Sequence, residues 1–233
     1  MNECKNDIFK KQKEGRFHYL LFDLDGTLTD PKIGITSCVQ YALRKMGIEE
    51  PDLKKLEPFI GPPLMDSFEE FYGFSEEQAR QAVAAYRERF STIGLFENEV
   101  YPGIPQMLAK LQKKGKKMAI ASSKPTIYVQ QILEHFEIKQ YFDVIIGSEM
   151  DGTRSRKEEV VEEALRQLLQ GGKVSKNTTV MIGDRKFDII GAKAYGLTGV
   201  GVCFGYAQEG ELEAAGADYV VDTVEQLEEL LLE

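Results

Sequence analysis

Residues 17–28 read FHYLLFDLDGTL, a short apolar run that ends in two aspartates and a glycine. The run 17–23 is almost continuously apolar, which is typical of a parallel strand covered on both faces. Asp23 and Asp25 come at its end, and Gly26 permits the turn that brings both carboxylates to a common region. Ligands of open α/β sheets bind beyond the carboxyl ends of the strands, so this segment predicts where a functional site lies.

Similar apolar runs recur along the rest of the chain. They lie at residues 117–122, 142–147, 178–183, 198–203 and 218–221. Amphipathic segments separate them, and one such segment carries apolar side chains at the i, i+3, i+4, i+7 spacing of a helix, at Ile104, Met107, Leu108 and Leu111. Strands that alternate with helices predict right-handed crossovers and a doubly wound, Rossmann-like parallel sheet of the α/β class.

The stretch between the first two predicted strands breaks this alternation. Residues 32–97 contain helical patterns punctuated by Gly and Pro and no convincing strand, which is far more chain than a crossover needs. We therefore expect a small α-helical cap domain at 32–97, inserted in a core formed by 17–31 and 98–233. A few extra helices packed on the core are the alternative. Residues 1–16 are expected to be an N-terminal tail.

Composition and charge exclude several classes of protein. The chain has 233 residues, with 29 Lys and Arg against 38 Asp and Glu, and a formal net charge of −9. We expect no nucleic-acid partner, because the phosphate backbone favours basic surfaces. We expect no membrane partner, and a cytoplasmic location, because no apolar run is long enough to span a bilayer and no signal peptide is evident. The three widely spaced cysteines predict neither a disulfide framework nor a zinc site.

A second acidic pair follows the fourth predicted strand. Gly183 precedes Asp184 there, and Asp188 follows four residues later. A single Asp after a strand is more often a loop or helix-cap residue, but four of them in two clusters favour a site. Such carboxylates repel one another unless one is protonated or a cation lies between them. Mg²⁺ is the expected cation, because this hard ion prefers carboxylate, carbonyl and water oxygens.

Two further groups of polar residues are candidates for binding an anion. The second predicted strand ends in Ser122 and Ser123, and hydroxyls and backbone N–H groups at a strand-to-helix turn can hold an oxyanion. Ser at a helix start is more often only an N-cap, so this motif is weak alone. Arg154, Arg156 and Lys157 form a basic cluster before a predicted helix, and a solvated surface run explains that cluster equally well.

In this order the motifs closely resemble those of the haloacid dehalogenase-like (HAD) phosphohydrolase superfamily. The resemblance is greatest to the phosphoglycolate phosphatase-type subgroup, which has a helical cap, and it covers nearly the whole chain after residue 16. Residues 22–28 (FDLDGTL) match the first motif and 119–125 (AIASSKP) match the second. Lys157 stands for the third-motif lysine, and 183–188 (GDRKFD) match the fourth motif.

The resemblance implies two catalytic aspartates and a metal site. Asp23 would be the nucleophile that forms an aspartyl-phosphate. Asp25 would protonate the leaving oxygen and then activate water as a base. Mg²⁺ would be held by Asp23, the backbone carbonyl of Asp25 and Asp184, with Asp188 acting directly or through water.

The resemblance also implies residues that bind the transferring phosphoryl group. Ser122 and Lys157 would contact its oxygens, where charge must be stabilised. Ser123 is the alternative to Ser122. Arg156 is the alternative to Lys157, because the third motif of this chain lacks the proline that often follows the lysine in the subgroup.

The function expected from these residues is that of an Mg²⁺-dependent phosphomonoesterase. It would hydrolyse a small phosphorylated metabolite, phosphoglycolate-like or 5′-nucleotide-like, and act as a monomer or homodimer. A phosphomutase of the β-phosphoglucomutase type is the alternative among enzymes, because it shares the motifs and the cap class. A receiver-like phospho-signalling module is the alternative of another class, although it needs neither Asp25 nor a helical insert. A dehalogenase is disfavoured, since displacing halide requires neither a metal nor an acid for the leaving group.

Substrate specificity is expected to lie in the cap, over the site. Residues 59–64 (FIGPPL) are candidates for a substrate-facing loop, and Arg87 and Arg89 for contacts with an anionic substrate. Turn rigidity and a solvated helix face explain the same residues at least as well.

Overall fold

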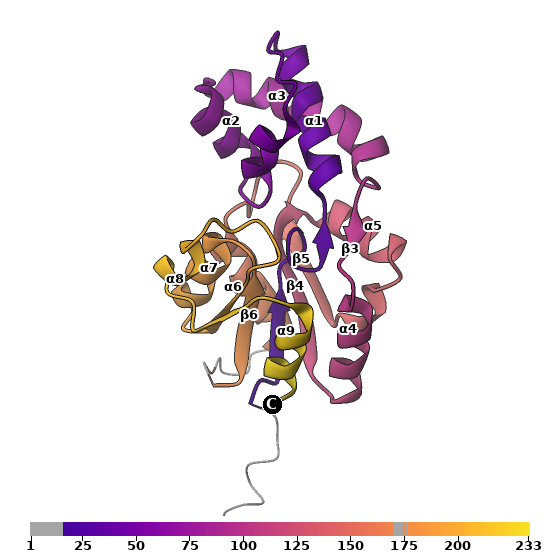
Figure 1. Cartoon of the computed structure of the whole chain (residues 1–233), viewed down its shortest axis with the longest axis vertical. Coiled ribbons are helices and arrows are strands. Elements are labelled where there is room, and N and C mark those ends of the chain that lie inside the picture. The colour runs from indigo at the N-terminus through magenta and orange to yellow at the C-terminus, as the bar shows by residue number, and fades with distance from the viewer. Residues whose placement is uncertain (1–15, 170–174, 176) are drawn as a thin grey trace, which may run out of the picture.

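The core is a parallel sheet of six strands in the order β5-β4-β1-β6-β7-β8 (Figure 1). The computed structural model describes residues 16–169, 175 and 177–233. The strands are β1 (Tyr19–Phe22), β4 (Lys117–Pro125), β5 (Val144–Ser148), β6 (Thr179–Gly183), β7 (Thr198–Val202) and β8 (Tyr219–Val221). All six predicted strands and the doubly wound α/β class are thereby confirmed.

Helices cover both faces of this sheet (Figure 1). One face packs on α4 (Ile104–Lys113), α5 (Thr126–His135) and α9 (Val224–Leu232), and the other on α6 (Lys157–Leu169) and α7 (Lys186–Ala194). A 3₁₀ turn η3 (Lys139–Tyr141) and a short helix α8 (Glu211–Ala214) complete the core.

Strand β1 illustrates why the apolar runs are continuous. Successive strand side chains point to opposite faces of a sheet. Leu20 and Phe22 lie in the core on one face of the sheet, and Leu21 lies in the separate core on the other face. All three side chains are fully buried. Two-sided burial therefore requires an apolar residue at every position of this strand.

The carboxyl end of β1 is the topological switch point of the sheet. β1 pairs with β4 on one side and with β6 on the other, so the chain winds first in one direction and then in the other. Ligands of open α/β sheets bind in the crevice at such a point. Asp23 follows β1 directly and therefore lies at this crevice.

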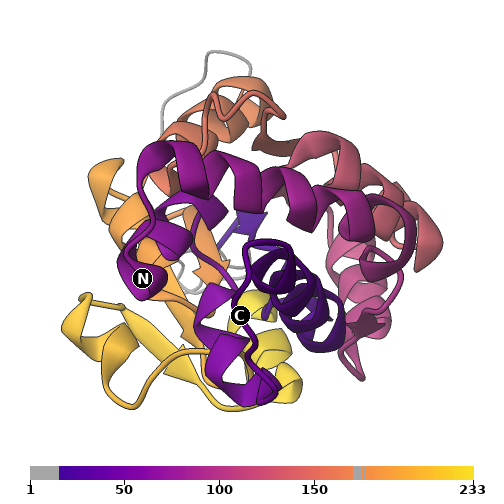
Figure 2. The ribbon, with the colours of Figure 1, turned by 90° about the horizontal axis from the view of Figure 1, so that it is seen from above.

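The segment between β2 (Thr29–Asp30) and β3 (Glu99–Val100) is helical, and its helices lie beyond the carboxyl edge of the sheet (Figures 1 and 2). They are α1 (Lys32–Lys45), the 3₁₀ helix η1 (Leu53–Phe59), α2 (Leu64–Tyr72), α3 (Glu76–Arg89) and the π-helical turn η2 (Phe90–Gly94). We call residues 32–97 the cap and the sheet with its covering helices the core. Division of the chain into domains at these residues stays a proposal.

Two features fix the base of the cap. β2 and β3 pair antiparallel, so the two chain connections of the cap run side by side. A strand of two residues is too short to show an alternation of apolar and polar residues, which is why the sequence does not predict this pair. In addition, a Cβ on Gly34 of α1 would lie 2.2 Å from the carbonyl oxygen of Gly94 in η2. Only glycine allows these two elements to approach so closely.

Strand β4 differs from its prediction at the carboxyl end. The sequence ends this strand at Ser122, whereas strand pairing with β5 resumes at Pro125 after an irregular stretch that begins at Ala121. Ser122 and Ser123 therefore lie within an irregular strand, and the expected strand-to-helix turn at these two residues is wrong. Helix α5 begins only after Pro125.

Other sequence-based expectations concern the chain ends, the thiols and the membrane. Residues 1–15 of the expected tail, with Cys4, lie outside the described residues. Cys38 is a buried free thiol and Cys203 an exposed one. Within the described residues no helix has both the length and the apolar character needed to cross a membrane.

Candidate active site

Three of the four predicted aspartates form one buried cluster. Carboxylate oxygens of Asp23, Asp184 and Asp188 all lie within 4.8 Å of one another, and the three residues are at most 4% exposed. They meet because β1 and β6 are neighbouring strands: Asp23 follows the first, Asp184 follows the second, and Asp188 lies in the first turn of α7. This spacing and donor type fit a divalent cation that prefers oxygen ligands.

Backbone groups hold these carboxylates in place. The N–H of Tyr206 donates to Asp184 Oδ2 at 2.8 Å, and the N–H of Arg185 donates to Asp188 Oδ2 at 3.0 Å. Gly26 has φ +79°, and a Cβ there would lie 2.1 Å from Asp184 Oδ2. The glycine of the first motif is therefore required twice, for the left-handed turn and for the close approach of the carboxylate.

Lys157 supplies the buried cation of the cluster. Its Nζ lies 2.9 Å from Asp23 Oδ1 and 2.8 Å from Asp188 Oδ1, and it donates to the carbonyl oxygen of Ala121 at 3.0 Å. Burial opposes the charged ammonium, but the two carboxylates outweigh it and raise the pKa of Lys157 above its usual value. Arg156, the alternative for this role, is exposed.

One ammonium does not neutralise three carboxylates. Burial raises the pKa of Asp184 well above its usual value, and the charges of Asp188 and Asp23 add to this effect. Burial also raises the pKa of Asp188 to about 6, against the opposing influence of Lys157. The cluster therefore carries a deficit of positive charge, which Mg²⁺ at the three carboxylates would supply.

Asp25 has a different environment from the other three aspartates. Its Oδ2 lies 2.7 Å from Lys124 Nζ, and the two side chains are 9% and 6% exposed. Within the described residues its Oδ1 has no hydrogen-bond partner. Burial raises the pKa of Asp25, and the ammonium of Lys124 partly offsets this. The carboxylate of Asp25 thus lies outside the acidic cluster, and the expected contribution of its backbone carbonyl stays a prediction.

A cavity of about 170 Å³ lies between the cap and the core beside Asp25. It extends from the carboxyl end of β4 to the turn before α2. The core contributes Ser123, Lys124 and Tyr128 to its lining, and the cap contributes Phe59, Tyr86, Arg87 and Phe90. A pocket with aromatic walls and a few polar groups is typical of a small-molecule site.

Comparison with known proteins identifies the family of the chain. A model described as haloacid dehalogenase-like hydrolase matches residues 20–202. The chain belongs to this family. The motif resemblance and the expected enzyme class, a phosphatase, are confirmed.

Individual relatives agree with this assignment. A protein named 5′-nucleotidase from Pseudomonas aeruginosa is 48% identical over 199 residues, which are 85% of this chain and 88% of that protein. A protein named tyrosine-protein kinase PtkA from Mycobacterium tuberculosis is 36% identical and aligns over 91% of this chain and 72% of its own. The crystal structure of a predicted phosphatase from Clostridium acetobutylicum has 45% identity and a TM-score of 0.88, covering 93% of this chain and 98% of that one.

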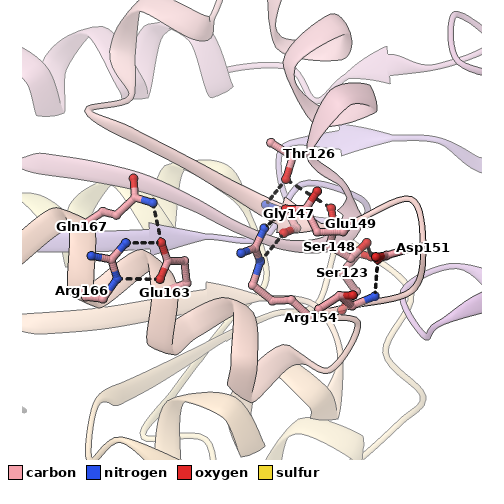
Figure 3. Close-up of polar contacts among 11 residues, drawn as sticks. Ser123, Thr126, Gly147, Ser148, Glu149, Asp151, Arg154, Glu163, Arg166 and Gln167 are labelled. Atoms are coloured by element: carbon pink, nitrogen blue, oxygen red, sulfur yellow. Dashed lines mark hydrogen bonds and ion pairs between the residues drawn. The ribbon is translucent and has the colours of Figure 1, made fainter.

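The serines of the second motif are held by their neighbours in this hydrolase. The hydroxyl of Ser148 donates to the carbonyl oxygen of Ser123 at 2.8 Å, and Thr126 bonds to both Gly147 and Ser148 (Figure 3). Ser123 lines the cavity, whereas Ser122 is buried, and its hydroxyl oxygen accepts a hydrogen bond from the N–H of Lys124 at 3.4 Å. Phosphate binding by either serine stays a prediction.

The three basic residues that are close together in the sequence lie apart in the structure of this hydrolase. Lys157 lies in the acidic cluster, and Arg156 is exposed. The guanidinium of Arg154 donates to the carbonyl oxygen of Gly147 at 2.9 Å and pairs with Glu149 (Figure 3). Arg154 thus supports the loop after β5 and does not contact the aspartates.

The two cap arginines also differ. Arg87 lines the cavity, and its Nη1 donates to the carbonyl oxygen of Met150 at 2.8 Å. Arg89 pairs with Glu97 through both guanidinium nitrogens, at 2.6 and 2.9 Å. Of these two arginines, only Arg87 is placed to meet a substrate.

The sequence analysis did not predict Lys124 as a site residue. Its position two residues after the second-motif Ser122 was a usable signal.

Proposed function

We propose that this hydrolase is an Mg²⁺-dependent phosphomonoesterase that acts on nucleoside 5′-monophosphates through an aspartyl-phosphate on Asp23. The observation that carries this proposal is the division of the first-motif aspartates between a buried cluster and a cavity. Asp23 lies in the buried acidic cluster beside Lys157. Asp25, two residues later, lines a cavity large enough for part of a leaving group.

The first step forms the covalent intermediate. A carboxylate oxygen of Asp23 attacks phosphorus, and the bond between phosphorus and the ester oxygen breaks. Asp25 gives its proton to that departing oxygen, so the leaving group departs as an alcohol. Burial raises the pKa of Asp25, which favours the protonated form that this step needs.

The second step releases phosphate. Asp25, now a carboxylate, takes a proton from a water molecule, whose oxygen attacks phosphorus. The bond between phosphorus and the Asp23 oxygen breaks, and Asp23 returns to its starting state. Lys157 remains beside Asp23 throughout, where its ammonium stabilises charge on the phosphoryl oxygens.

Mg²⁺ would be held by Asp23, Asp184 and Asp188, whose oxygens share one buried site. Its charge would offset the repulsion between a carboxylate nucleophile and a phosphate dianion. Lys157 alone does not supply this charge, because it already compensates Asp23 and Asp188.

Two observations support a nucleotide as the substrate class. Four aromatic side chains line the cavity and offer faces for a planar base: Phe59, Tyr86, Phe90 and Tyr128. The relative that is 48% identical is named 5′-nucleotidase. Phosphoglycolate has a leaving group of only two carbons and would leave these walls without contacts.

A second candidate is transfer of the phosphoryl group to an acceptor other than water. The relative named tyrosine-protein kinase PtkA is the reason for considering such a transfer. A phosphomutase is another form of the same chemistry. The two candidates differ in the fate of the intermediate. A phosphatase passes the phosphoryl group to water within its turnover time, whereas a transferase holds it until an acceptor arrives.

A substrate panel tests the proposal. Phosphate release is measured from nucleoside 5′-monophosphates, nucleoside 3′-monophosphates, phosphoglycolate and sugar phosphates, with Mg²⁺ and with EDTA. We expect the 5′-monophosphates to have the highest kcat/KM, and only with Mg²⁺. Acid-quenched phosphoenzyme should appear in the first turnover. Efficient turnover of phosphoglycolate alone would reject the substrate class, and transfer to a tyrosine peptide or sugar phosphate in preference to water would favour the second candidate.

A further inference from the structure

Lys124 is a buried cation that the proposed reaction does not use. Its Nζ lies 2.7 Å from Asp25 Oδ2 and 4.7 Å from the centroid of the Phe90 ring. Asp25 and Lys124 belong to the core, and Phe90 belongs to the cap. The ammonium is therefore held between a core carboxylate and a cap ring, an arrangement that combines an ion pair with a cation–π contact.

The backbone of Lys124 is fixed independently of its side chain. Its N–H donates to Ser122 Oγ at 3.4 Å. A Cβ on Gly147 of β5 would lie 2.3 Å from the carbonyl oxygen of Lys124, so β5 packs tightly against this residue. The side chain thus begins from a rigid point at the end of β4 and reaches Asp25 from the cavity side.

Lys124 also gives Asp25 a cation of its own, different from the cation that pairs with the other aspartates. Asp23 and Asp188 have Lys157 as their cation, and Asp25 has Lys124. Without Lys124 the buried carboxylate of Asp25 would lack a compensating charge and would turn toward the nearest cation. Lys157 is the other cation that acts on Asp25, and a turn toward it, or toward a metal that the acidic cluster would hold, would misdirect Asp25 for proton transfer.

We propose that Lys124 is the positioning residue that holds Asp25 on the cavity side of the site, facing the leaving group. One carboxylate oxygen is held by the ammonium, which leaves Asp25 Oδ1 for the substrate. The inference rests on the proposed function, because proton transfer by Asp25 is part of that function. Phe90 links this arrangement to the cap, so Asp25 is held most firmly when the cap lies over the site.

The position of Phe90 supports such a link. Its ring stacks on Tyr86 of α3, with centroids 5.1 Å apart, and forms a T-shaped pair with Tyr128 of α5, with centroids 5.3 Å apart. It thus lies in an aromatic cluster that joins the cap to the core. Movement of the cap away from the core would remove the ring from Lys124 and weaken its hold on Asp25.

A leaving-group comparison in single turnovers tests the proposal. A nucleoside monophosphate has a poor leaving group that needs a proton, whereas p-nitrophenolate departs without one. General acid catalysis contributes about 10²–10⁴-fold, and Lys124→Met should lose a part of it, about 10–100-fold, with the nucleotide. The loss with p-nitrophenyl phosphate should stay below about 5-fold, and KM should change little for either substrate. Lys124→Arg should recover most of the rate.

A double-mutant cycle shows whether Lys124 acts through Asp25. If it does, Lys124→Met added to Asp25→Asn causes no further loss. Losses that multiply would mean that Lys124 contacts the substrate directly and would overturn the proposal. Lys117→Met is the matched control, because Lys117 lies at the other end of β4 and pairs with Asp143 at the surface. It should leave both rates unchanged.

The failure of this proposal is distinguishable from that of the proposed function. If Asp25→Asn slows both substrates equally, proton transfer by Asp25 is wrong, and the proposed mechanism fails. If the loss of rate caused by Asp25→Asn depends on the leaving group and the loss caused by Lys124→Met does not, only the role of Lys124 fails. Phe90→Leu provides a second variant that keeps the ion pair, for use if Lys124→Met does not fold. In single turnovers at saturating substrate, which remove the contribution of Phe90 to substrate binding, a loss with Phe90→Leu that is equal for both leaving groups would also overturn the proposal.

Discussion

The guanidinium of Arg185 connects the core to the cap: its Nη1 donates to the carbonyl oxygen of Ile60 at 2.6 Å. Glu211 of α8 anchors the same side chain, with 3.0 Å between Arg185 Nε and Glu211 Oε1. Arg185 follows Asp184 directly in the sequence, so a residue of the proposed metal site is adjacent to the residue that holds the cap turn. We therefore expect the position of that turn and the acidic cluster to be coupled.

We expect Arg185→Met to weaken substrate binding more than chemistry. A buried hydrogen bond to a charged group contributes about 1.5–3 kcal/mol, so the free energy of unfolding should fall by about that amount. KM should rise about 10-fold because the cap turn lining the cavity loses its anchor. Steady-state kinetics and urea denaturation measure the two effects. Arg166→Met is the control, since Arg166 pairs with Glu163 at the surface; an unchanged KM in Arg185→Met would contradict the coupling.

Asp23→Asn should abolish turnover while the protein still folds. The side chain is a nucleophile in the proposed mechanism, and the amide cannot attack phosphorus as a carboxylate does. Loss of one charge from the crowded cluster should keep the thermal transition within a few degrees of the wild type. Phosphate release and differential scanning fluorimetry measure these outcomes. Asp23→Ala must accompany it, because deamidation would restore Asp; residual activity above about a percent in both variants would reject the role of Asp23.

Calcium should inhibit the Mg²⁺-activated enzyme. Ca²⁺ takes more ligands than Mg²⁺ and would draw both oxygens of Asp23 into its coordination shell, leaving neither free to attack. EDTA should abolish activity, and added Mg²⁺ should restore it. Full activity with Ca²⁺ or in metal-free buffer would be incompatible with the proposed site.

Stability of the metal-free protein should fall as the pH rises through the range of Asp188. In the unfolded chain this residue loses its proton near its ordinary pKa of 3.8, whereas burial in the folded protein raises the pKa to about 6. Between these values the folded state binds more protons, so the free energy of unfolding decreases with rising pH. Mg²⁺ bound at this site would replace the proton, and its stabilising effect on Tm should be larger at pH 7 than at pH 4.5. Equal Tm increments at the two pH values would argue against a metal site at Asp188.

Arg87→Met should affect nucleotides more than small aryl phosphates. Arg87 lines the cavity and donates through Nη1 to a backbone carbonyl, which leaves its other guanidinium nitrogens available to a substrate oxygen. Loss of a charge-assisted hydrogen bond should raise the KM for a nucleoside monophosphate about 10-fold. The KM for p-nitrophenyl phosphate should change less than about 3-fold. Arg80→Met is the control on the same helix, because Arg80 is exposed and pairs with Glu76; equal effects of the two variants would remove Arg87 from substrate recognition.

Sequence patterns predict those parts of this structure that depend on local chain properties. The six strands follow from apolar runs, and the acidic cluster follows from aspartates placed after two of them. Asp23 and Asp184 meet because their strands are neighbours, a relationship that a parallel sheet with its switch point at β1 makes accessible. The helical character of 32–97 is likewise a local property of its sequence.

Features that depend on the direction of a side chain, or on packing between distant segments, cannot be predicted from sequence patterns. The ion pair of Lys124 with Asp25 requires knowledge of how the irregular end of β4 aims a long side chain. The contact of Arg185 with Ile60 joins residues that are 125 positions apart. The sequence also places Ser122 and Ser123 at a turn, because it cannot show that strand pairing resumes at Pro125.

The central position of β1 has a consequence for the synthesis of the chain. Tyr19 of this strand pairs with Lys117 on one side and with Thr179 on the other, so the nucleophile strand emerges early and both of its neighbours emerge much later. Contacts between such distant segments form slowly, and apolar surface that waits for a partner is prone to aggregation. We expect a nascent chain that ends before β6 to expose Leu21 and its neighbours and to need protection until Gly183 has left the ribosome. A truncated chain of that length contains Asp23 but lacks β6, the neighbouring strand that places Asp184 beside it.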